Sequence, residues 1–268
     1  MLSFDRAMRA TRGARDYQED TALLWPGDAA SAPQGGAPAG SGTLLAVLAD
    51  GMGGHAGGAL ASRTVCDEFR QAYAGLEGDV TSALIEGLRA ANAAIAGKVE
   101  SDPLLAGMGS TLVGVLFEDA GMSWVSVGDS PLLLWRRGEI EPLNEDHSLA
   151  PDIDRRMRAG EITPEQAKRD PRRHMLRSAV TGEEIDLIDI SCEPLRLEPD
   201  DYVILASDGL QTLEDSEVSR IIMAYGADGA DAVASALIRT IDGLRELHQD
   251  NATVIVVRVN AESASGKV

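Results

Sequence analysis

Four short apolar runs of this chain each border an aspartate, and this pattern limits the possible folds more than any other feature. The pairs are Asp50 after residues 44–49, Asp129 after 124–128, Asp208 after 202–207, and Asp250 shortly before 254–259. Short runs rich in Val, Ile and Leu and bounded by Gly or Asp are typical of buried strands. Strand ends from distant parts of a sequence can meet at one edge of a sheet. We therefore expect the four carboxylates to converge there.

The residue types at these positions indicate a metal site for a hard cation. No Cys or His recurs at the strand borders, and carboxylates with backbone carbonyls suit Mg²⁺ or Mn²⁺ better than zinc. A simple turn is the competing interpretation of each aspartate, because Asp-Gly is a common turn dipeptide. The stretch D-G-M-G-G-H-A-G-G at residues 50–58 is too long for a two-residue hairpin, which favours the metal site.

The glycines of the same stretch also permit a nucleotide-binding interpretation. Gly51-x-Gly53-x-x-Ala56, between an expected strand and an expected helix, formally meets the dinucleotide fingerprint. However, Asp50 would repel the pyrophosphate, and no strand ending in an acid follows about 20 residues later. A P-loop is excluded because no Gly-Lys-Ser/Thr follows.

Composition narrows the class of protein. The 268 residues suffice for one large or two small domains, and 44% hydrophobic content supports a substantial core. A net charge of −19 and a pI near 4.5 argue against nucleic acid or an anionic membrane as a partner. Residues 1–20 do not resemble a signal peptide, and no run is as long as a membrane span. We expect a cytoplasmic protein in which Cys66 and Cys192 are buried thiols.

Hydrophobic periodicity predicts antiparallel strands interrupted by two pairs of helices. The expected strands are 21–25, 43–49, 111–117, 122–127, 132–135, one near Ile140, 186–191, 202–206 and 253–259. The expected helices are 59–71, 80–99 with Asp79 as its N-cap, 216–225 and 230–248. The short turns at 118–121 and 128–131 predict antiparallel neighbours on either side of each.

This order of elements predicts an α+β fold, not a doubly wound parallel sheet. A four-layer α-β-β-α sandwich, with two mainly antiparallel sheets flanked by helical pairs, gives each amphipathic helix one sheet face. Residues 1–260 are expected to form a single domain. Residues 26–42 are predicted to be a flexible surface loop, and residues 261–268 a short disordered tail.

Seven short motifs resemble those of a known family, and they occur in its order. They are A-R-D-Y-Q-E-D (14–20), D-G-M-G-G-H (50–55), G-S-T-L (109–112), V-G-D-S (127–130), D-H-S-L (146–149), S-D-G-L (207–210) and D-N-A-T (250–253). The chain resembles the metal-dependent, type 2C-like (PPM) serine/threonine protein phosphatases, in their bacterial branch. The resemblance covers about residues 10–260 and implies the same α-β-β-α sandwich.

The resemblance implies a centre with two Mn²⁺ or Mg²⁺ ions and a weaker third. Its implied ligands are Asp50 as the bridge, the Gly51 carbonyl, Asp208 and Asp250, with Glu19 and Asp20 holding metal-bound waters or coordinating directly, and Asp129 at the third position. Arg15 matches the family's phosphate-binding arginine, so Arg15 and Asp50 are the expected catalytic residues. The implied reaction is hydrolysis of phosphoserine and phosphothreonine by a water that bridges two metals.

One departure from the eukaryotic pattern concerns the general acid. Eukaryotic members carry a histidine directly after the Asp-Gly pair, whereas Met52 stands there in this chain, as in other bacterial members. His55 lies three residues further on, and both a catalytic role and a structural hydrogen bond remain open for it.

Residues 146–181 resemble the family's mobile flap, and here the charge of the chain reverses. Residues 155–177 hold eight Lys and Arg against three acids, in a chain that is otherwise strongly acidic. Arg169, Arg172 and Arg173 are candidates for recruiting phosphorylated proteins, and a solvated helix face is the competing interpretation. The expected partners are proteins phosphorylated by a Ser/Thr kinase, with no nucleic acid or membrane, and the expected state is a monomer. The alternative function is a catalytically weak, partner-binding regulatory module on the same fold.

Overall fold

The computed structural model describes residues 2–26, 43–54, 56–74 and 79–261, and within them two antiparallel sheets pack face to face. The first sheet has the order β1-β11-β10-β7-β8, with β1 (Leu2–Thr11), β11 (Ala252–Ala261), β10 (Tyr202–Ala206), β7 (Leu132–Arg136) and β8 (Glu139–Pro142). The second has the order β2-β3-β5-β6-β9, with β2 (Asp20–Trp25), β3 (Leu44–Met52), β5 (Leu112–Glu118), β6 (Gly121–Val127) and β9 (Asp189–Ile190), while β4 (Gly109–Ser110) pairs with β3.

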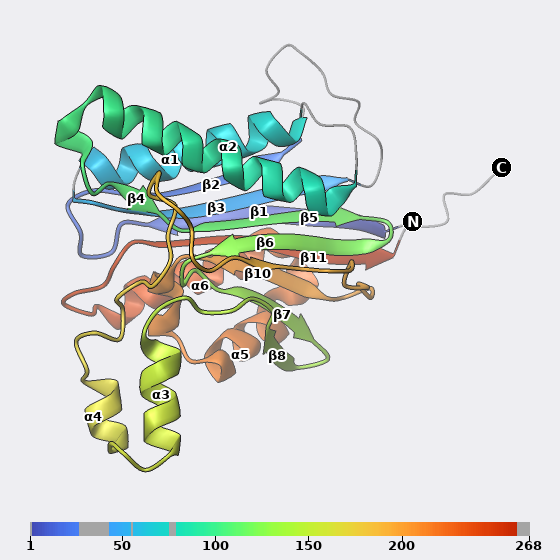
Figure 1. Cartoon of the computed structure of the whole chain (residues 1–268). Helices are drawn as coiled ribbons and strands as arrows, with labels where there is room; N and C mark the ends of the chain where they lie inside the picture. The colour runs from blue at the N-terminus through green and yellow to red at the C-terminus, as the bar shows by residue number, and fades with distance from the viewer. Residues whose placement is uncertain (1, 27–42, 55, 75–78, 262–268) are drawn as a thin grey trace.

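Helices cover the outer face of each sheet, as Figure 1 shows. Over the second sheet lie α1 (Ala56–Ala74) and α2 (Val80–Ser101), and over the first lie α5 (Asp215–Tyr225) and α6 (Ala230–Leu244). The predicted α+β class and the four-layer order are confirmed.

Three apolar clusters separate these layers. Alternate side chains of a strand point to opposite faces, so each central strand contributes to two clusters. In β3, for example, Leu45 and Val47 pack toward α1 and α2, whereas Ala46 and Leu48 join the cluster between the sheets. This double burial explains why β3 is an almost continuous apolar run.

Helix α2 begins as its sequence predicts. The Asp79 carboxylate accepts a hydrogen bond from the Ser82 amide at 3.0 Å, which satisfies one of the free N–H groups of the first turn. Leu84, Leu88 and Ile95, which recur at helical spacing, are all buried against the second sheet.

Other elements differ from their sequence-based expectations. Strand β1 was not predicted, because it is an edge strand on which most side chains are partly or fully exposed, although it pairs with β11 along its whole length. The strand expected at 186–191 is reduced to the two residues of β9. Helix α6 ends at Leu244, before the predicted 248, because Arg245 adopts a left-handed conformation with φ of 53°.

The prediction for the turn at 128–131 is wrong. Strand β6 before this turn belongs to the second sheet, whereas β7 after it belongs to the first. A short connection can therefore also join two strands that face each other across a sandwich. The other short turn, at 118–121, does join the antiparallel neighbours β5 and β6.

Two short helices, α3 (Ala150–Arg158) and α4 (Pro164–Lys168), lie within residues 146–181, the predicted flap, and project from one end of the sandwich in Figure 1. Thr163 and Gln166 close a capping box at the start of α4. Among the described residues, no helix is both long enough and apolar enough to cross a bilayer.

Several predictions concern residues that the structure does not describe, and one further prediction is wrong. Residues 27–42 of the expected loop, His55, and residues 262–268 of the expected tail lie outside the described residues. Cys66 is buried as expected, but the expectation for Cys192 is wrong, since Cys192 is exposed in the segment after β9.

Candidate metal centre

The predicted aspartates meet at one edge of the sandwich, where strands of both sheets begin or end. Asp20 opens β2 and lies opposite Asp50 of β3 in the strand register. Asp208 lies two residues after β10, at the start of a short 3₁₀ helix, and Asp250 lies two residues before β11. Together with Arg15, Glu19, Gly51 and Asp129, the side chains of Asp50, Asp208 and Asp250 line one cleft of about 740 Å³.

The carboxylates of this cleft destabilise one another's charged forms. Burial, and then the charges of Asp20, Asp208, Asp129 and Asp250, raise the pKa of Asp50 well above its ordinary value. Burial followed by the charges of Asp250 and Asp20 raises the pKa of Asp208 to about 6. Burial followed by the charges of Asp208 and Asp146 raises the pKa of Asp129 to about 7. Asp50, Asp129 and Asp208 have no ion pair with a described residue, whereas Asp250 is paired with Arg15.

Asp20 is fixed on one side only. Its Oδ2 accepts hydrogen bonds from the hydroxyls of Ser207 and Thr253, each at 2.7 Å, which tie β2 to the first sheet. Its Oδ1 is buried and has no hydrogen-bond partner among the described residues. Burial raises the pKa of Asp20, against the opposing effect of hydrogen bonds with Thr253, Ser207 and Asp50. A buried carboxylate oxygen without a donor suits a cation.

The main chain around Asp50 is held by the G-S-T-L motif. The Asp50 amide donates to the Thr111 hydroxyl at 2.9 Å, and the Asp50 carbonyl accepts from the Ser110 hydroxyl at 2.8 Å. The Thr111 hydroxyl also lies 2.7 Å from that of Ser130, next to Asp129. These buried hydroxyls link two candidate ligands from different elements, Asp50 of β3 and Asp129 in the turn after β6.

Close packing of glycines shapes the wall of the cleft beside Asp50. A side chain on Gly58 would press on the Glu19 carboxylate and come within 2.9 Å of the Gly51 carbonyl oxygen. Gly58 therefore leaves room for two of the predicted ligand groups, the Glu19 carboxylate and the Gly51 carbonyl. The Gly51 amide in turn donates to the Glu19 carbonyl at 3.2 Å.

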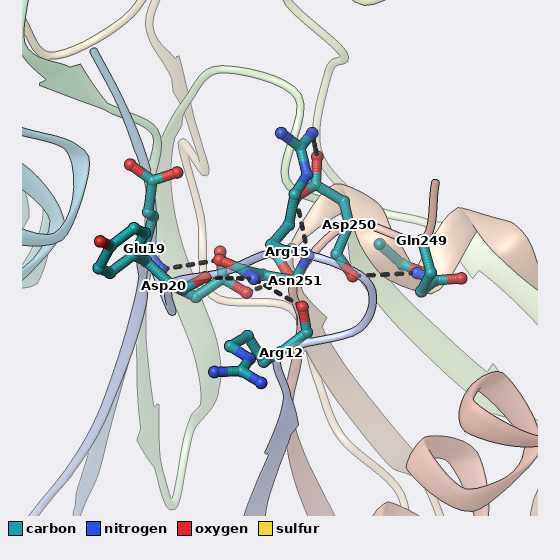
Figure 2. A network of polar contacts seen from close by, with 10 residues as sticks. Arg12, Arg15, Glu19, Asp20, Gln249, Asp250 and Asn251 are labelled. Atoms are coloured by element: carbon teal, nitrogen blue, oxygen red, sulfur yellow. Dashed lines mark hydrogen bonds and ion pairs between the residues drawn. The ribbon is translucent and has the colours of Figure 1, made fainter. Parts of the chain in front are cut away.

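Asn251 organises the loop that carries Arg15 and Glu19, and sequence reasoning missed this role (Figure 2). Its Oδ1 accepts from the Glu19 amide at 2.7 Å. Its Nδ2 donates to the carbonyls of Arg12 and Tyr17, at 3.0 and 2.9 Å. The D-N-A-T motif thus contributes a candidate ligand, Asp250, and the residue that holds the opposite loop. A side-chain amide can do both because it donates and accepts.

Replacing Asn251 with alanine is expected to lower the free energy of unfolding by about 2–4 kcal/mol, since three hydrogen bonds to main-chain groups are lost at a buried position. Urea denaturation measures this change. Asn260→Ala is the matched control, because the Asn260 side chain makes no hydrogen bond to any described residue, and its loss should stay within about 0.5 kcal/mol. Equal effects of the two substitutions would contradict the role of Asn251.

The Arg15 side chain, which the sequence predicts to bind phosphate, contacts a candidate metal ligand in this structure. Its guanidinium donates to the Asp250 carboxylate at 2.5 Å, as Figure 2 shows. Both side chains are substantially exposed, at 54% and 39%. An exposed ion pair contributes only about 0–1 kcal/mol, so a stronger partner of either group can replace it.

The residues present fit a divalent cation by their chemistry. All side-chain donors are hard oxygens, one buried oxygen of Asp20 has no donor, and the carboxylates raise one another's pKa values. As the side chains stand, no three Asp, Glu, His or Cys residues of the described chain form a group that could hold a metal.

His147 supports the position of Asp129 and was also missed. Its imidazole Nδ1 accepts from the Gly128 amide at 3.2 Å, and its own amide donates to the Gly128 carbonyl at 3.1 Å. Its carbonyl accepts from the Arg177 amide at 2.7 Å, which anchors the end of the flap. Burial lowers the pKa of His147, in keeping with a neutral acceptor.

Most of the flap's positive charge is paired within the flap. Arg173 forms two hydrogen bonds to Asp154, at 2.6 and 2.9 Å, and Arg172 forms two to Asp170, at 2.7 and 2.9 Å. Arg169, in contrast, makes no ion pair with any described residue. Of the three arginines proposed from the sequence to recruit substrates, two therefore have local partners.

Comparison with known proteins agrees with the four-layer sandwich. The family model described as "Protein phosphatase 2C" matches residues 35–246. The chain belongs to this family, so the predicted resemblance is confirmed.

Named relatives and solved structures lie in the same family. The chain is 36% identical over 224 residues to the serine/threonine protein phosphatase PstP of Mycobacterium tuberculosis, a match that covers 82% of this chain and 41% of that protein. It is 31% identical over 228 residues to the protein phosphatase PhpP of Streptococcus pneumoniae, covering 84% of this chain and 89% of that one. The chain thus spans less than half the length of PstP.

Among solved structures, the Mycobacterium tuberculosis PstP phosphatase matches with a TM-score of 0.77 and 30% identity, over 97% of this chain and 100% of that one. The catalytic domain of PstP in complex with two manganese ions matches with a TM-score of 0.75 and 30% identity, over the same shares of each chain.

Proposed function

We propose that this protein is a Mn²⁺- or Mg²⁺-dependent phosphatase that hydrolyses phosphoserine and phosphothreonine in proteins. The observation that carries the proposal is the cleft in which Asp50, Asp129 and Asp208 all have raised pKa values, with Arg15 on its wall. The family and the two manganese ions of the related PstP domain support the same assignment.

Two ions, with a weaker third, would be held by the oxygen donors of this cleft. The assigned groups are the carboxylates of Asp50, Asp208 and Asp250 and the carbonyl of Gly51, with Glu19 and Asp20 beside them and Asp129 for the third ion. When bound, such ions neutralise the carboxylates and lower the pKa of water toward neutrality. This assignment is physically consistent because Asp50, Asp129 and Asp208 have no ion pair with a described residue and raise one another's pKa values.

The residues of the chain then divide the remaining tasks between them. When the Arg15 guanidinium leaves Asp250, its planar fork can donate hydrogen bonds to two phosphoryl oxygens and orient the phosphate. Asn251 keeps the loop of Arg15 in place, and the hydroxyls of Ser207 and Thr253 keep Asp20 oriented. No nucleophilic side chain is required, because the attacking group is water.

A catalytically weak, partner-binding module on the same fold is the less favoured alternative. The presence of Arg15 and of the full set of acids argues against it, since a module that only binds partners does not need an acidic cleft that destabilises its own fold.

For the cellular setting, we infer a cytoplasmic monomer that acts on substrates of a Ser/Thr kinase. The net charge of −19 and two unpaired cysteines support that setting.

Hydrolysis of p-nitrophenyl phosphate is expected to require Mn²⁺, to stop with EDTA and to return when Mn²⁺ is restored. Arg15→Ala should raise KM for this substrate by roughly 10- to 100-fold, the equivalent of one or two charge-assisted hydrogen bonds. Arg12→Ala is the control, because Arg12 lies in the same loop but its guanidinium bonds to the Asp16 carbonyl. Activity that survives EDTA would refute the proposed function.

A further inference from the structure

A second groove, of about 1110 Å³, opens directly from the metal cleft. The two hollows share Arg15, His174, Asp208 and Asp250, so they form one continuous depression. A phosphoserine or phosphothreonine in the cleft carries polypeptide on both sides, and this groove offers one exit for it.

The walls of the groove come from two separate parts of the chain. One wall is the flap, through Met157 and Ala167, and the other is the segment before β11, through Leu247 and His248. The side chain of Leu247 is 85% exposed. A single exposed leucine is ordinary on a protein surface, but this one borders a groove that leads to the reaction cleft. The groove therefore has an apolar contact surface.

One cation of the flap wall is available to a ligand. Arg173 in the groove is paired with Asp154, as described above, whereas Lys168 forms no ion pair with any described residue. The groove also has four acidic residues, and the protein as a whole is acidic, so the unpaired lysine is the point of attraction for an acidic side chain. The four acids are Asp154 and Asp250, each paired with an arginine, and Asp208 and Glu246.

We propose that this groove binds the polypeptide that flanks the phosphorylated residue, with Lys168 contacting an acidic side chain and Leu247 an apolar one. This inference rests on the proposed function, because it takes the neighbouring cleft as the phosphate site. It assigns substrate selection to the groove and not to the ion-paired arginines Arg172 and Arg173.

The chain offers a matched control for Lys168 at the next position. Arg169 also lacks an ion pair within the described chain, but it lines a separate surface depression together with Glu165, Asp170 and Pro171. Substitution of either residue changes the charge of the flap by the same amount. Only Lys168 is placed to change the charge of the groove.

The test compares two phosphoserine peptides that differ only in flanking glutamates or lysines, assayed with Mn²⁺. The wild type is expected to prefer the glutamate peptide by about fivefold in kcat/KM, the effect of one exposed charge pair. Lys168→Glu should reverse the preference, mainly through KM, and high salt should reduce the difference. A reversal of sign cannot result from a general loss of folding. Arg169→Glu should leave the preference nearly unchanged.

A second arm tests the apolar contact. Leu247→Ser should lower kcat/KM severalfold for a peptide with flanking leucines and much less for one with flanking serines. Leu104→Ser is the control, because Leu104 is 93% exposed and lies outside the groove. Equal changes for Lys168 and Arg169, or a Leu247 effect that does not depend on the peptide, would overturn the inference.

The same assays separate the groove from the proposed function. Every variant is also measured on p-nitrophenyl phosphate, which has no polypeptide and should be hydrolysed at the wild-type rate. If the wild type hydrolyses neither p-nitrophenyl phosphate nor the peptides, the proposed function fails. If it hydrolyses all of them and Lys168→Glu leaves the peptide preference unaltered, only the groove assignment fails.

Discussion

Asp208→Ala is expected to lower turnover of p-nitrophenyl phosphate by on the order of 10²-fold or more. Asp208 belongs to the cleft and, with Asp20, Asp129 and Asp250, surrounds Asp50 closely enough to raise its pKa. Alanine removes one of the proposed oxygen ligands. Steady-state kinetics at saturating Mn²⁺ measures the loss, and isothermal titration calorimetry should show weaker or fewer Mn²⁺ sites.

The control and a second readout distinguish this loss from misfolding. Asp228→Ala changes an exposed aspartate that has no ion pair with a described residue, and it should retain full activity. Metal-free Asp208→Ala should also be more stable than the metal-free wild type at pH 7, because one buried, repelled carboxylate is gone. Full activity of Asp208→Ala would show that Asp208 is not a ligand of the proposed metal centre.

The second large effect concerns stability without metal, which is expected to fall as the pH rises from about 4.5 to 7.5. The pKa of Asp208 is raised to about 6 and that of Asp129 to about 7, while both groups titrate near 4 in an unfolded chain. The folded state therefore binds more protons in this interval, and the stability present below pH 4 is lost as the pH passes through 6 to 7. Thermal unfolding in EDTA across this range measures the decline.

Millimolar Mn²⁺ should reverse this decline at pH 7.5. A ligand of the native state at a hundredfold excess over Kd adds about 2.7 kcal/mol, which corresponds to a rise in Tm of roughly 5–10 °C for a chain of this size. At pH 4.5 the protonated carboxyls should bind little metal, so Tm should hardly change. Asp208→Asn is the control, and its metal-free decline should be shallower. A Tm that Mn²⁺ leaves unchanged at pH 7.5 would contradict the assignment.

The strands and the candidate ligands could be predicted because their signals are local. Strand β10 was predicted with its observed bounds, since five apolar residues followed by Ser-Asp-Gly define it without reference to the rest of the chain. Helix α2 follows from its own periodicity and its Asp79 cap. Asp50, Asp208 and Asp250 could be predicted as candidate ligands because each lies at the border of a strand. Their convergence could be predicted because antiparallel packing brings strand ends together.

The edge strand of one sheet, and the connection that passes from one sheet to the other, could not be predicted from local sequence. Strand β1 buries only Ala7 fully, with Leu2 and Phe4 partly buried, so its local signal is weak and its pairing with β11 defines it. The turn at 128–131 is as short as a hairpin, and its residues do not say that β7 will join the opposite sheet. The sheet that β7 joins depends on its pairing partner, which is β10 of the first sheet.

By itself the sequence determined an acidic, four-layer sandwich, the identity of its candidate oxygen ligands and one basic flap. Only the tertiary structure decided what each charge contacts. Arg15 and Asp250 are separated by 235 positions and pair because the loop before β2 meets the start of β11. Arg173 pairs with Asp154, which leaves Lys168 available in the groove. Residue type fixes the chemistry of a group, whereas the partner of a charge depends on packing between segments that no local pattern relates.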